Sequence, residues 1–504
     1  MPAQRLKYVL ALQGVAIALF ALAMQSFGWA QSQLPELPKT WEAQAISSIE
    51  VPLANPKYSP THISADYYYA IPARRVFKSY PVYAPGKEPS DYMEWLKNQE
   101  PKLAFDAAQL KSESDWVTAG ELVFDAPIAY DFIAGVSQVR SDAWYKKTGT
   151  PVSREGIMPF ARYVIRNKGQ VEVGTLSCAM CHTRVLPDGT IVKGAQGNFP
   201  FDRAVAFSIR AGLAGSLKQV QETARAAFDT PWLSPNPNAR LAQMSLEDIA
   251  SAHDAIPPGV IARNRASLLY PVQVPDLIGV RDRLYLDRTG INLHRNIGDM
   301  MRYAALNQGG DDLASFGGWR PLDGQYPEPA ELTRYSDEQL YALTLYLYSL
   351  KPPHNPNRLD ELAMRGKKVF MQKGCESCHS PPLYTNNKLV PATGFKIPPT
   401  HLEEFDVNPV LIGTDPGLTL FTRRGTGYYK VPSLLGLWYR GPFEHSGSEL
   451  TLEDWFDPRR LQDDHVPTGF RGLDGKSRAI PGHRFGLDLS DEDRKALIAF
   501  LKTL

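Results

Sequence analysis

Net charge and cysteine are scarce in this sequence, and methionine is missing from its C-terminal part. The 55 basic residues nearly cancel the 54 acidic residues in a chain of 504. A nucleic-acid partner would favour a strongly basic face, so this balance argues against one. There are only four cysteines, and Met371 is the last methionine. Both shortages limit which side chains can bind a metal.

Long apolar runs are also rare, because only the N-terminus has one. Arg5 and Lys7 precede an apolar run over residues 8–24, and the small residues Gly28 and Ala30 follow at cleavage positions. This pattern predicts a signal peptide over residues 1–30. The run is long for a signal, so an uncleaved membrane anchor stays open as the alternative. In either case we expect the body of the protein in the periplasm.

All four cysteines belong to two copies of one motif. The copies are Cys178-Ala-Met-Cys181-His182 and Cys375-Glu-Ser-Cys378-His379. Four cysteines in an exported chain would otherwise suggest two disulfides. Cys-x-x-Cys-His is instead the attachment site of a c-type haem, in which both thiols bond to the porphyrin and the histidine binds the iron. The sequence therefore predicts two covalently bound c-type haems.

The two motifs lie in related halves of the chain. Val274-Pro-Asp-Leu-Ile-Gly-Val280 recurs as Val431-Pro-Ser-Leu-Leu-Gly-Leu437, and the match continues at three later positions: Arg283 with Arg440, Asp287 with Glu444, and Gly290 with Gly447. Each half ends on Ser-Asp-Glu followed by an apolar run, over residues 336–350 and 490–504. This pattern predicts a capped closing helix in each half. Three matched segments in the same order indicate a duplication.

These patterns predict a mainly α protein of two duplicated cytochrome c-like domains with large loop insertions. Residues 351–358 are rich in proline and cannot continue the first closing helix, so the domains should span residues 113–350 and 351–504. Residues 31–112 are expected to form an irregular N-terminal extension.

No methionine follows the second motif, so the far side of the second iron is expected to have histidine, tyrosine or no protein ligand. Histidine is a common metal ligand, and four histidines are candidates: His401, His445, His465 and His483. His483, in a short loop before the closing helix, is the favoured ligand. His445 is the second choice.

The first iron is expected to have an open face. Pro329 and Arg288 occupy the places of His483 and His445 in the first half, and neither can bind iron. An open face permits peroxide or dioxygen chemistry, whereas a second protein ligand makes an electron carrier. Five substitutes stay open as ligands: Met244, Met300, Met301, His253 and His294.

The chain resembles the di-haem cytochrome c peroxidase/MauG superfamily over roughly residues 113–504. The second half carries the more specific motifs: Tyr429-Lys-Val-Pro-Ser-Leu434, Pro442-Phe-Glu-His-Ser-Gly-Ser448, Thr451-Leu-Glu453 and Gly482-His-Arg-Phe-Gly486. In the first half, Val274–Gly279 and His294-Arg-Asn-Ile-Gly298 look like the rubber-oxygenase-like members. The missing late methionine departs from bacterial peroxidases, which puts reduction of hydrogen peroxide in doubt.

The resemblance implies a reactive N-terminal haem and a C-terminal haem that relays electrons. Peroxide or dioxygen would be the oxidant, and a redox protein or small electron donor the partner. His294 and Arg295 are candidate catalytic residues that would polarise a bound O–O bond. A structural ion-pair or hydrogen-bonding role is the favoured alternative for both, because a general acid must reach the reacting atom. Trp319 and Trp438 are candidates for electron transfer, although core packing is the more common role of tryptophan. A pure electron carrier is the alternative function, and a haem-based sensor is a weaker third.

Overall fold

The protein is described by a computed structural model that covers residues 37–504 except 264 and 323–325. The expected signal peptide and its apolar run lie outside the described residues. Residues 39–504 fold as one unit. Within the described part of the chain, no helix is both long and apolar enough to cross a membrane.

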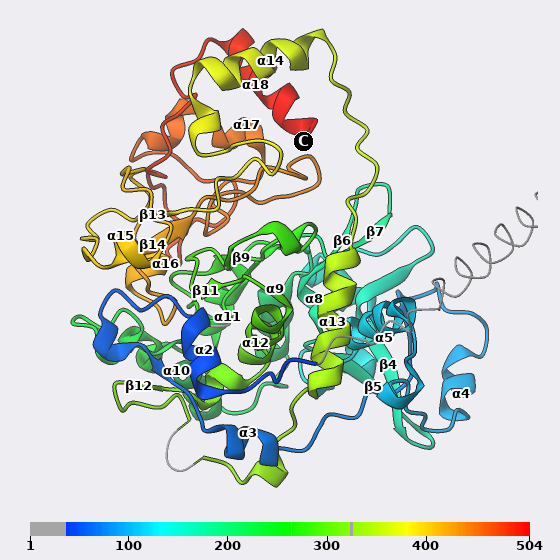
Figure 1. The fold of residues 1–504 in the computed structure, drawn as a ribbon. Coiled ribbons are helices and arrows are strands. Elements are labelled where there is room, and N and C mark those ends of the chain that lie inside the picture. The colour runs from blue at the N-terminus through cyan, green and yellow to red at the C-terminus, as the bar shows by residue number, and fades with distance from the viewer. Residues whose placement is uncertain (1–36, 264, 323–325) are drawn as a thin grey trace, which may run out of the picture. The chain divides into compact units, whose positions relative to one another are not determined.

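Helices outweigh strands, at 36% against 12% of the residues, so the expectation of a mainly α protein is confirmed at that level. Two helix pairs dominate (Figure 1). Helix α5 (Glu113–Asp125) packs against α13 (Asp337–Ser349), and α14 (Glu361–Gln372) packs against α18 (Asp491–Lys502). Ser336 and Ser490 cap α13 and α18, as the sequence predicts for the two closing helices.

The two helix crossings repeat each other residue for residue. A side chain at Gly120 would overlap the carbonyl oxygen of Ala342, and one at Gly366 would overlap that of Ala496. Ala342 and Ala496 each lie six residues after the capping serine of their helix. One turn beyond each glycine an aromatic pair closes the contact: Phe124 with Tyr346 at 5.3 Å and Phe370 with Phe500 at 5.4 Å. Both halves therefore build the same close crossing.

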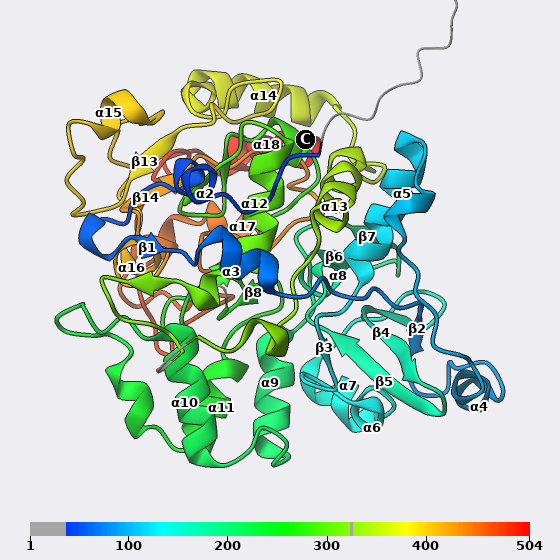
Figure 2. The same cartoon turned by 60° about the horizontal axis from the view of Figure 1, so that its bottom comes forward.

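An antiparallel sheet that the sequence did not predict lies before the first motif, and the N-terminal extension contributes one of its strands. Its strand order is β2 (Ser79–Tyr83), β4 (Ile157–Asn167), β5 (Gln170–Thr175) and β3 (Ala129–Tyr130) (Figure 2). The buried side chains of β4 and β5 join a core that includes Met180, the residue between Cys178 and Cys181. The sheet thus fixes the first motif from one side.

The extension contributes regular structure to this part of the fold. It supplies β2 to the sheet, and β1 (Pro60–Thr61) pairs with β12 (Ser315–Phe316). It also holds α2 (Ala43–Ile49), α3 (Ala65–Ala70) and α4 (Tyr92–Lys97). The expected irregular segment therefore packs as part of the first half, and the domain boundaries stay predictions.

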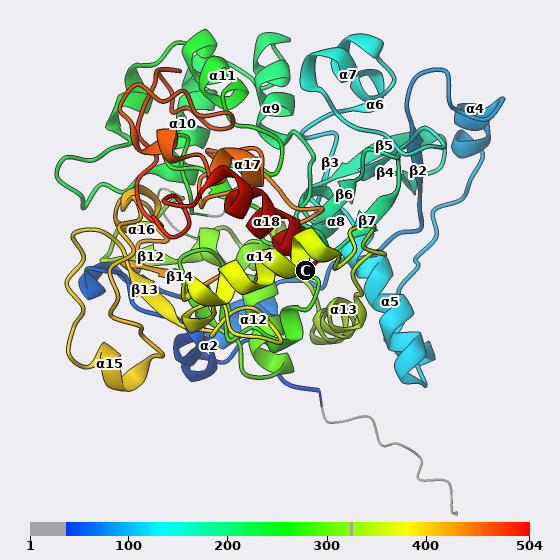
Figure 3. The same cartoon turned by 90° about the horizontal axis from the view of Figure 1, so that it is seen from above.

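The remaining helices and strands complete the described part of the fold (Figure 3). The helices are α6 (Val136–Val139), α7 (Asp142–Thr148), α8 (Cys178–Cys181), α9 (Phe201–Arg210), α10 (Leu217–Phe228), α11 (Leu246–Asp254), α12 (Ile297–Asn307), α15 (His401–Glu404), α16 (Gly417–Leu420) and α17 (Leu452–Trp455). The strands are β6 (Thr183–Val185), β7 (Ile191–Lys193), β8 (Val260–Ile261), β9 (Val272–Gln273), β10 (Tyr285–Leu286), β11 (Asn292–Leu293), β13 (Leu389–Pro391) and β14 (Tyr428–Lys430).

Candidate haem sites

The second motif opens into a cavity of about 240 Å³ that Cys375, Cys378 and His379 line. Helix α14 ends at Gln372, and the left-handed backbone of Gly374 (φ 70°) then turns the chain into the motif. Nδ1–H of His379 donates to the carbonyl oxygen of Tyr384 at 3.1 Å. This bond assigns the proton to Nδ1 and leaves Nε2 free to bind a metal.

His379 and His483, which the sequence predicts as an axial pair, both line this cavity. Their ring centroids are 6.4 Å apart. Two histidines on opposite sides of one metal ion, with metal–nitrogen bonds of about 2.0 Å, place their centroids about 6.3 Å apart. Burial, His379 and Arg460 lower the pKa of His483 to about 3, so the imidazole is in the neutral, metal-binding form. Its Nδ1 has no hydrogen-bond partner among the described residues.

Arg460 holds the loop that carries His483. This arginine is fully buried. It donates to the carbonyl oxygens of Ile480 at 2.6 Å, Gly482 at 3.0 Å and His483 at 2.8 Å. Its guanidinium stacks over the ring of Trp455, with 4.1 Å from carbon to centroid. His483 has a positive φ of 43°, an unfavourable backbone for a residue with a side chain. The three bonds to the loop offset this strain.

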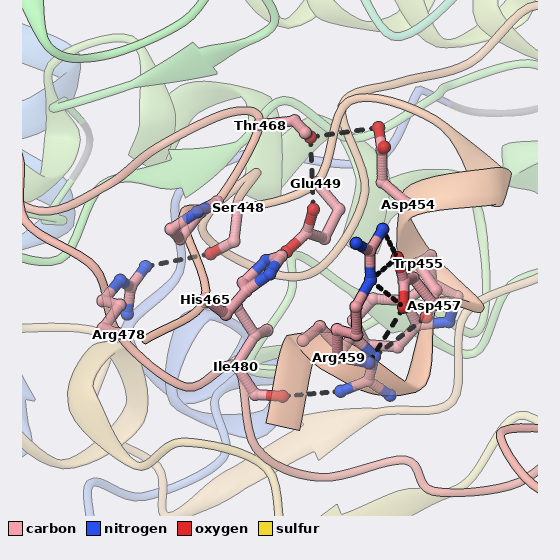
Figure 4. A network of polar contacts seen from close by, with 12 residues as sticks. Ser448, Glu449, Asp454, Trp455, Asp457, Arg459, His465, Thr468, Arg478 and Ile480 are labelled. Atoms are coloured by element: carbon pink, nitrogen blue, oxygen red, sulfur yellow. Dashed lines mark hydrogen bonds and ion pairs between the residues drawn. The ribbon is translucent and has the colours of Figure 1, made fainter. Parts of the chain in front are cut away.

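A second network ties the same loop to α17 (Figure 4). His465 contacts the buried carboxylate of Glu449 at 2.7 Å. The Thr468 hydroxyl lies 3.1 Å from Glu449 and 3.0 Å from Asp454. Arg478 donates to the Ser448 hydroxyl at 2.9 Å. Both ends of the 448–483 segment are therefore fixed, and His465 is occupied as a structural partner of Glu449.

His445 also lines the second cavity, but another group already engages it. Its Nδ1 contacts the carboxylate of Glu444, and its ring lies 4.6 Å from that of Tyr429. Burial alone would raise the pKa of Glu444, but His445 and hydrogen bonds from Ser446 lower it to about 2. The fourth candidate, His401, bonds the Tyr428 hydroxyl at 3.0 Å and does not line the cavity. Geometry thus favours His483 over His445, His401 and His465.

The first motif lies beside a smaller cavity of about 80 Å³, lined by Cys178, Cys181 and His182. Nδ1–H of His182 donates to the carbonyl oxygen of Pro275 at 3.0 Å. Burial lowers the pKa of His182 to about 4, against the effect of this bond. The ring is therefore neutral and fixed in the same tautomer as His379.

The matched segments of the two halves have matched roles around the cavities. Arg283 donates to the carbonyl oxygens of Asp276 and Ile278. Arg440 donates to those of Ser433 and Leu435. In both halves the two carbonyls lie seven and five residues before the arginine. Both halves also place equivalent loop and closing-helix residues against their motifs: Val274, Pro275, Leu277, Leu343 and Leu347 in the first, and Val431, Pro432, Leu434, Leu497 and Leu501 in the second.

The far side of the first cavity differs from that of the second. Asn296 caps α12 and Thr451 caps α17, which makes Met300 the counterpart of Trp455, the residue beside His483. Helix α12 is longer than α17 and adds polar residues to the cavity wall: Tyr303, Asn307 and Gln308. Gln308 Oε1 has no hydrogen-bond partner among the described residues. Sequence analysis did not identify these three residues, because only the helix length brings them to the cavity.

Of the five substitute ligands, only Met300 lines the first cavity. Met301 is buried in the core, Met244 packs beside α11, and His253 bonds Asp202 at 2.7 Å. Both nitrogens of His294 are engaged, with the Arg283 carbonyl at 2.9 Å and the Tyr348 hydroxyl at 2.6 Å.

The structure does not bring the predicted catalytic pair to either cavity. His294 and Arg295 are absent from both linings, and Arg295 pairs with Asp299 at 2.9 Å. Their catalytic role stays a prediction that this geometry does not support. Trp319 packs near Trp232 and Phe316, and Trp438 packs beside Tyr439, as core residues do.

Both sets of residues fit a c-type haem. In each, two cysteines without a disulfide and a neutral histidine with a free Nε2 surround one cavity. The two cysteine pairs are consistent with two c-type haem attachment sites.

The comparisons with known proteins give only distant likenesses. No family model and no curated protein matches the chain. A hydrazine synthase structure from Kuenenia stuttgartiensis, pressurised with xenon, is similar with a TM-score of 0.30 and 16% identity, over 59% of this chain and 92% of that one. A MauG-like protein associated with microbial copper homeostasis is similar with a TM-score of 0.20 and 20% identity, over 33% of this chain and 56% of that one. TM-scores this low carry no argument about function.

Proposed function

We propose that the chain is a periplasmic di-haem c-type cytochrome oxidoreductase of the peroxidase or oxygenase type, as its resemblance to the cytochrome c peroxidase/MauG superfamily implies. The observation that carries the proposal is the difference between the two cavities. A second histidine, His483, lies near the motif histidine in the second cavity, whereas His182 is the only histidine among the described residues that line the first.

Each haem would have a separate role in this proposal. Cys375, Cys378, His379 and His483 would hold a closed haem that relays electrons from a redox partner or small donor. Cys178, Cys181 and His182 would hold the haem that meets peroxide or dioxygen. A bound haem supplies the redox chemistry, while the protein supplies binding and orientation. Tyr303, Asn307 and Gln308 are among the polar side chains that line this cavity, and in this proposal they would orient a small oxygen ligand.

A pure electron carrier is the second candidate, and Met300 is the observation that favours it. A thioether in the wall of the first cavity is a group that can close a haem iron. Both irons would then have two protein ligands, and neither would take an external one.

Binding of external ligands separates the two functions. We expect one haem of the two to bind cyanide in the ferric protein and carbon monoxide in the ferrous protein, because one face lacks a strong ligand. That binding should persist in His483→Ala, in which the second haem also becomes accessible. His401→Ala is the control, since His401 lies outside both cavity linings. If neither haem of the wild-type protein takes a ligand, even after partial reduction, the electron carrier replaces the enzyme.

A further inference from the structure

Three cations from different parts of the chain line the second cavity. They are Arg288, which belongs to the first half, and Lys430 and Arg440 of the second half. Arg283 lies behind them and contributes to the electrostatics of both Arg288 and Lys430. We call Arg288, Lys430 and Arg440 the cation cluster.

The cation cluster has unused hydrogen-bonding capacity. Nε and Nη2 of the buried Arg288 have no partner among the described residues, and neither has Nε of Arg440. Within the described ranges, Nζ of Lys430 donates to a backbone carbonyl alone, that of Tyr285 at 3.2 Å. Unpartnered buried donors and charges are costly, so a native site supplies partners for them.

The nearby carboxylates do not neutralise the cation cluster. Glu444 is engaged by His445 and Ser446. Asp276 accepts from the Tyr439 hydroxyl at 3.0 Å and lies 4.0 Å from Arg283. Burial, Arg440 and Arg283 lower the pKa of Arg288 to about 9, and Asp276 and Glu444 offset this only in part. Basic side chains therefore outnumber acidic partners at this wall, and burial with the neighbouring arginines lowers the pKa of Lys430 well below its usual value, so this ammonium lacks a compensating anion among the described residues.

We propose that the cation cluster binds the two propionate carboxylates of the haem attached at Cys375 and Cys378. This inference rests on the proposed function, because it requires that haem. A haem is an apolar disc with two carboxylates on one edge, and the cavity joins apolar walls to a single cationic wall. Arginine suits this role because its planar fork binds a carboxylate through two parallel hydrogen bonds.

Both halves of the chain supply residues to the proposed propionate site. Arg288 follows Asp287 in the first half, yet it lines the cavity of the second motif. Conversely, Arg424 of the second half lines the cavity of the first motif, where it pairs with Asp287. Each haem would thus meet an arginine from the opposite half.

The reduction potential of the second haem tests this assignment. Cations beside the propionates favour the ferrous state, because reduction removes one positive charge from the haem. We expect Arg288→Met to lower the potential of the second haem and to leave the first less affected. Lys430→Met should lower it as well, and Arg288→Lys should retain most of the wild-type value. Arg365→Met is the control, because Arg365 is exposed on α14 and pairs with Asp493.

Haem content, measured on the same samples, separates failure of the proposed function from failure of the propionate assignment. Wild-type protein without covalent haem would overturn the proposed function itself. Two attached haems with an unchanged potential in both Arg288→Met and Lys430→Met would overturn the propionate assignment alone. A wild-type potential that depends on phosphate concentration would also overturn it, because a solvent anion would then occupy the cation cluster. If Arg288→Met does not fold, the reduction potential of the second haem in Lys430→Met tests the propionate assignment instead.

Discussion

At the scale of single residues, the proposed axial ligand depends on a residue outside the sequence motifs. His483 adopts a backbone conformation that its side chain disfavours. Arg460 bonds three carbonyls of its loop and stacks on Trp455. Arg460 does not contact a haem directly in this scheme. It is a positioning residue, whose effect is expected at the iron.

Arg460→Met should loosen the second haem's distal ligand while leaving covalent attachment intact. The variant removes the bonds to Ile480, Gly482 and His483, so we expect part of the low-spin ferric signal to become high-spin. The fraction of low-spin haem, measured by absorption and electron paramagnetic resonance, is the readout. Arg460→Lys should restore it in part.

The neighbouring Arg459 provides the control for this prediction. Its side chain is 84% exposed and pairs with Asp457, so Arg459→Met should leave the spectrum unchanged. A wild-type spectrum in Arg460→Met would mean that the loop holds His483 without this arginine.

At the scale of elements, the repeated helix crossing explains why both halves have glycine at one position. A methyl group at Gly366 would overlap the Ala496 carbonyl oxygen, and one at Gly120 would overlap that of Ala342. The close approach of backbones requires glycine here, although glycine is otherwise unfavourable inside a helix.

Gly366→Ala should therefore destabilise the protein by about 1–3 kcal/mol, the usual cost of an overpacked core. An exposed helix position would show the opposite sign, a gain of about 0.5–1 kcal/mol. Urea unfolding of the haem-loaded protein measures the difference, and Lys367→Ala on the exposed face of α14 is the control. An increase in the free energy of unfolding for Gly366→Ala would show that α14 and α18 do not cross this closely.

The sequence predicted the elements that local patterns encode. Capping serines and apolar spacing located α13 and α18, and the position of the loop before α18 identified His483. Long-range pairing was not predictable in the same way. Strand β2 joins the sheet only through β4, some 80 residues later, and no local pattern marks that partner. Tyr303 and Gln308 reach the first cavity because α12 continues beyond the length of its counterpart α17.

Arg288 illustrates the same limit for the site. By position it is the counterpart of His445, and the sequence excluded it as an iron ligand. Aligning the two halves assigns each residue a role beside the haem motif of its own half. Such an alignment cannot show that Arg288, from the first half, lines the cavity of the second motif.

At the scale of the whole molecule, each motif should load its haem independently. Cys375→Ala with Cys378→Ala should leave one covalent haem per chain, and so should Cys178→Ala with Cys181→Ala. Ser377→Ala, which alters the same motif and keeps both cysteines, should leave two. Haem content per protein after acid–acetone extraction is the measurement. Complete loss of haem from wild-type protein on extraction would contradict covalent attachment.

The hydrogen bonds that the two motif histidines donate limit what can cause a difference in reduction potential between the two haems. Nδ1–H of His182 and of His379 each donates to a backbone carbonyl, at 3.0 and 3.1 Å. Such a bond makes an imidazole a stronger electron donor to its metal. Because the two donors are alike, they shift both irons in the same direction and by similar amounts. The driving force for electron flow between the irons must then originate on their opposite faces and in the charges around them, where His483, Met300 and the cation cluster break the symmetry of the duplication.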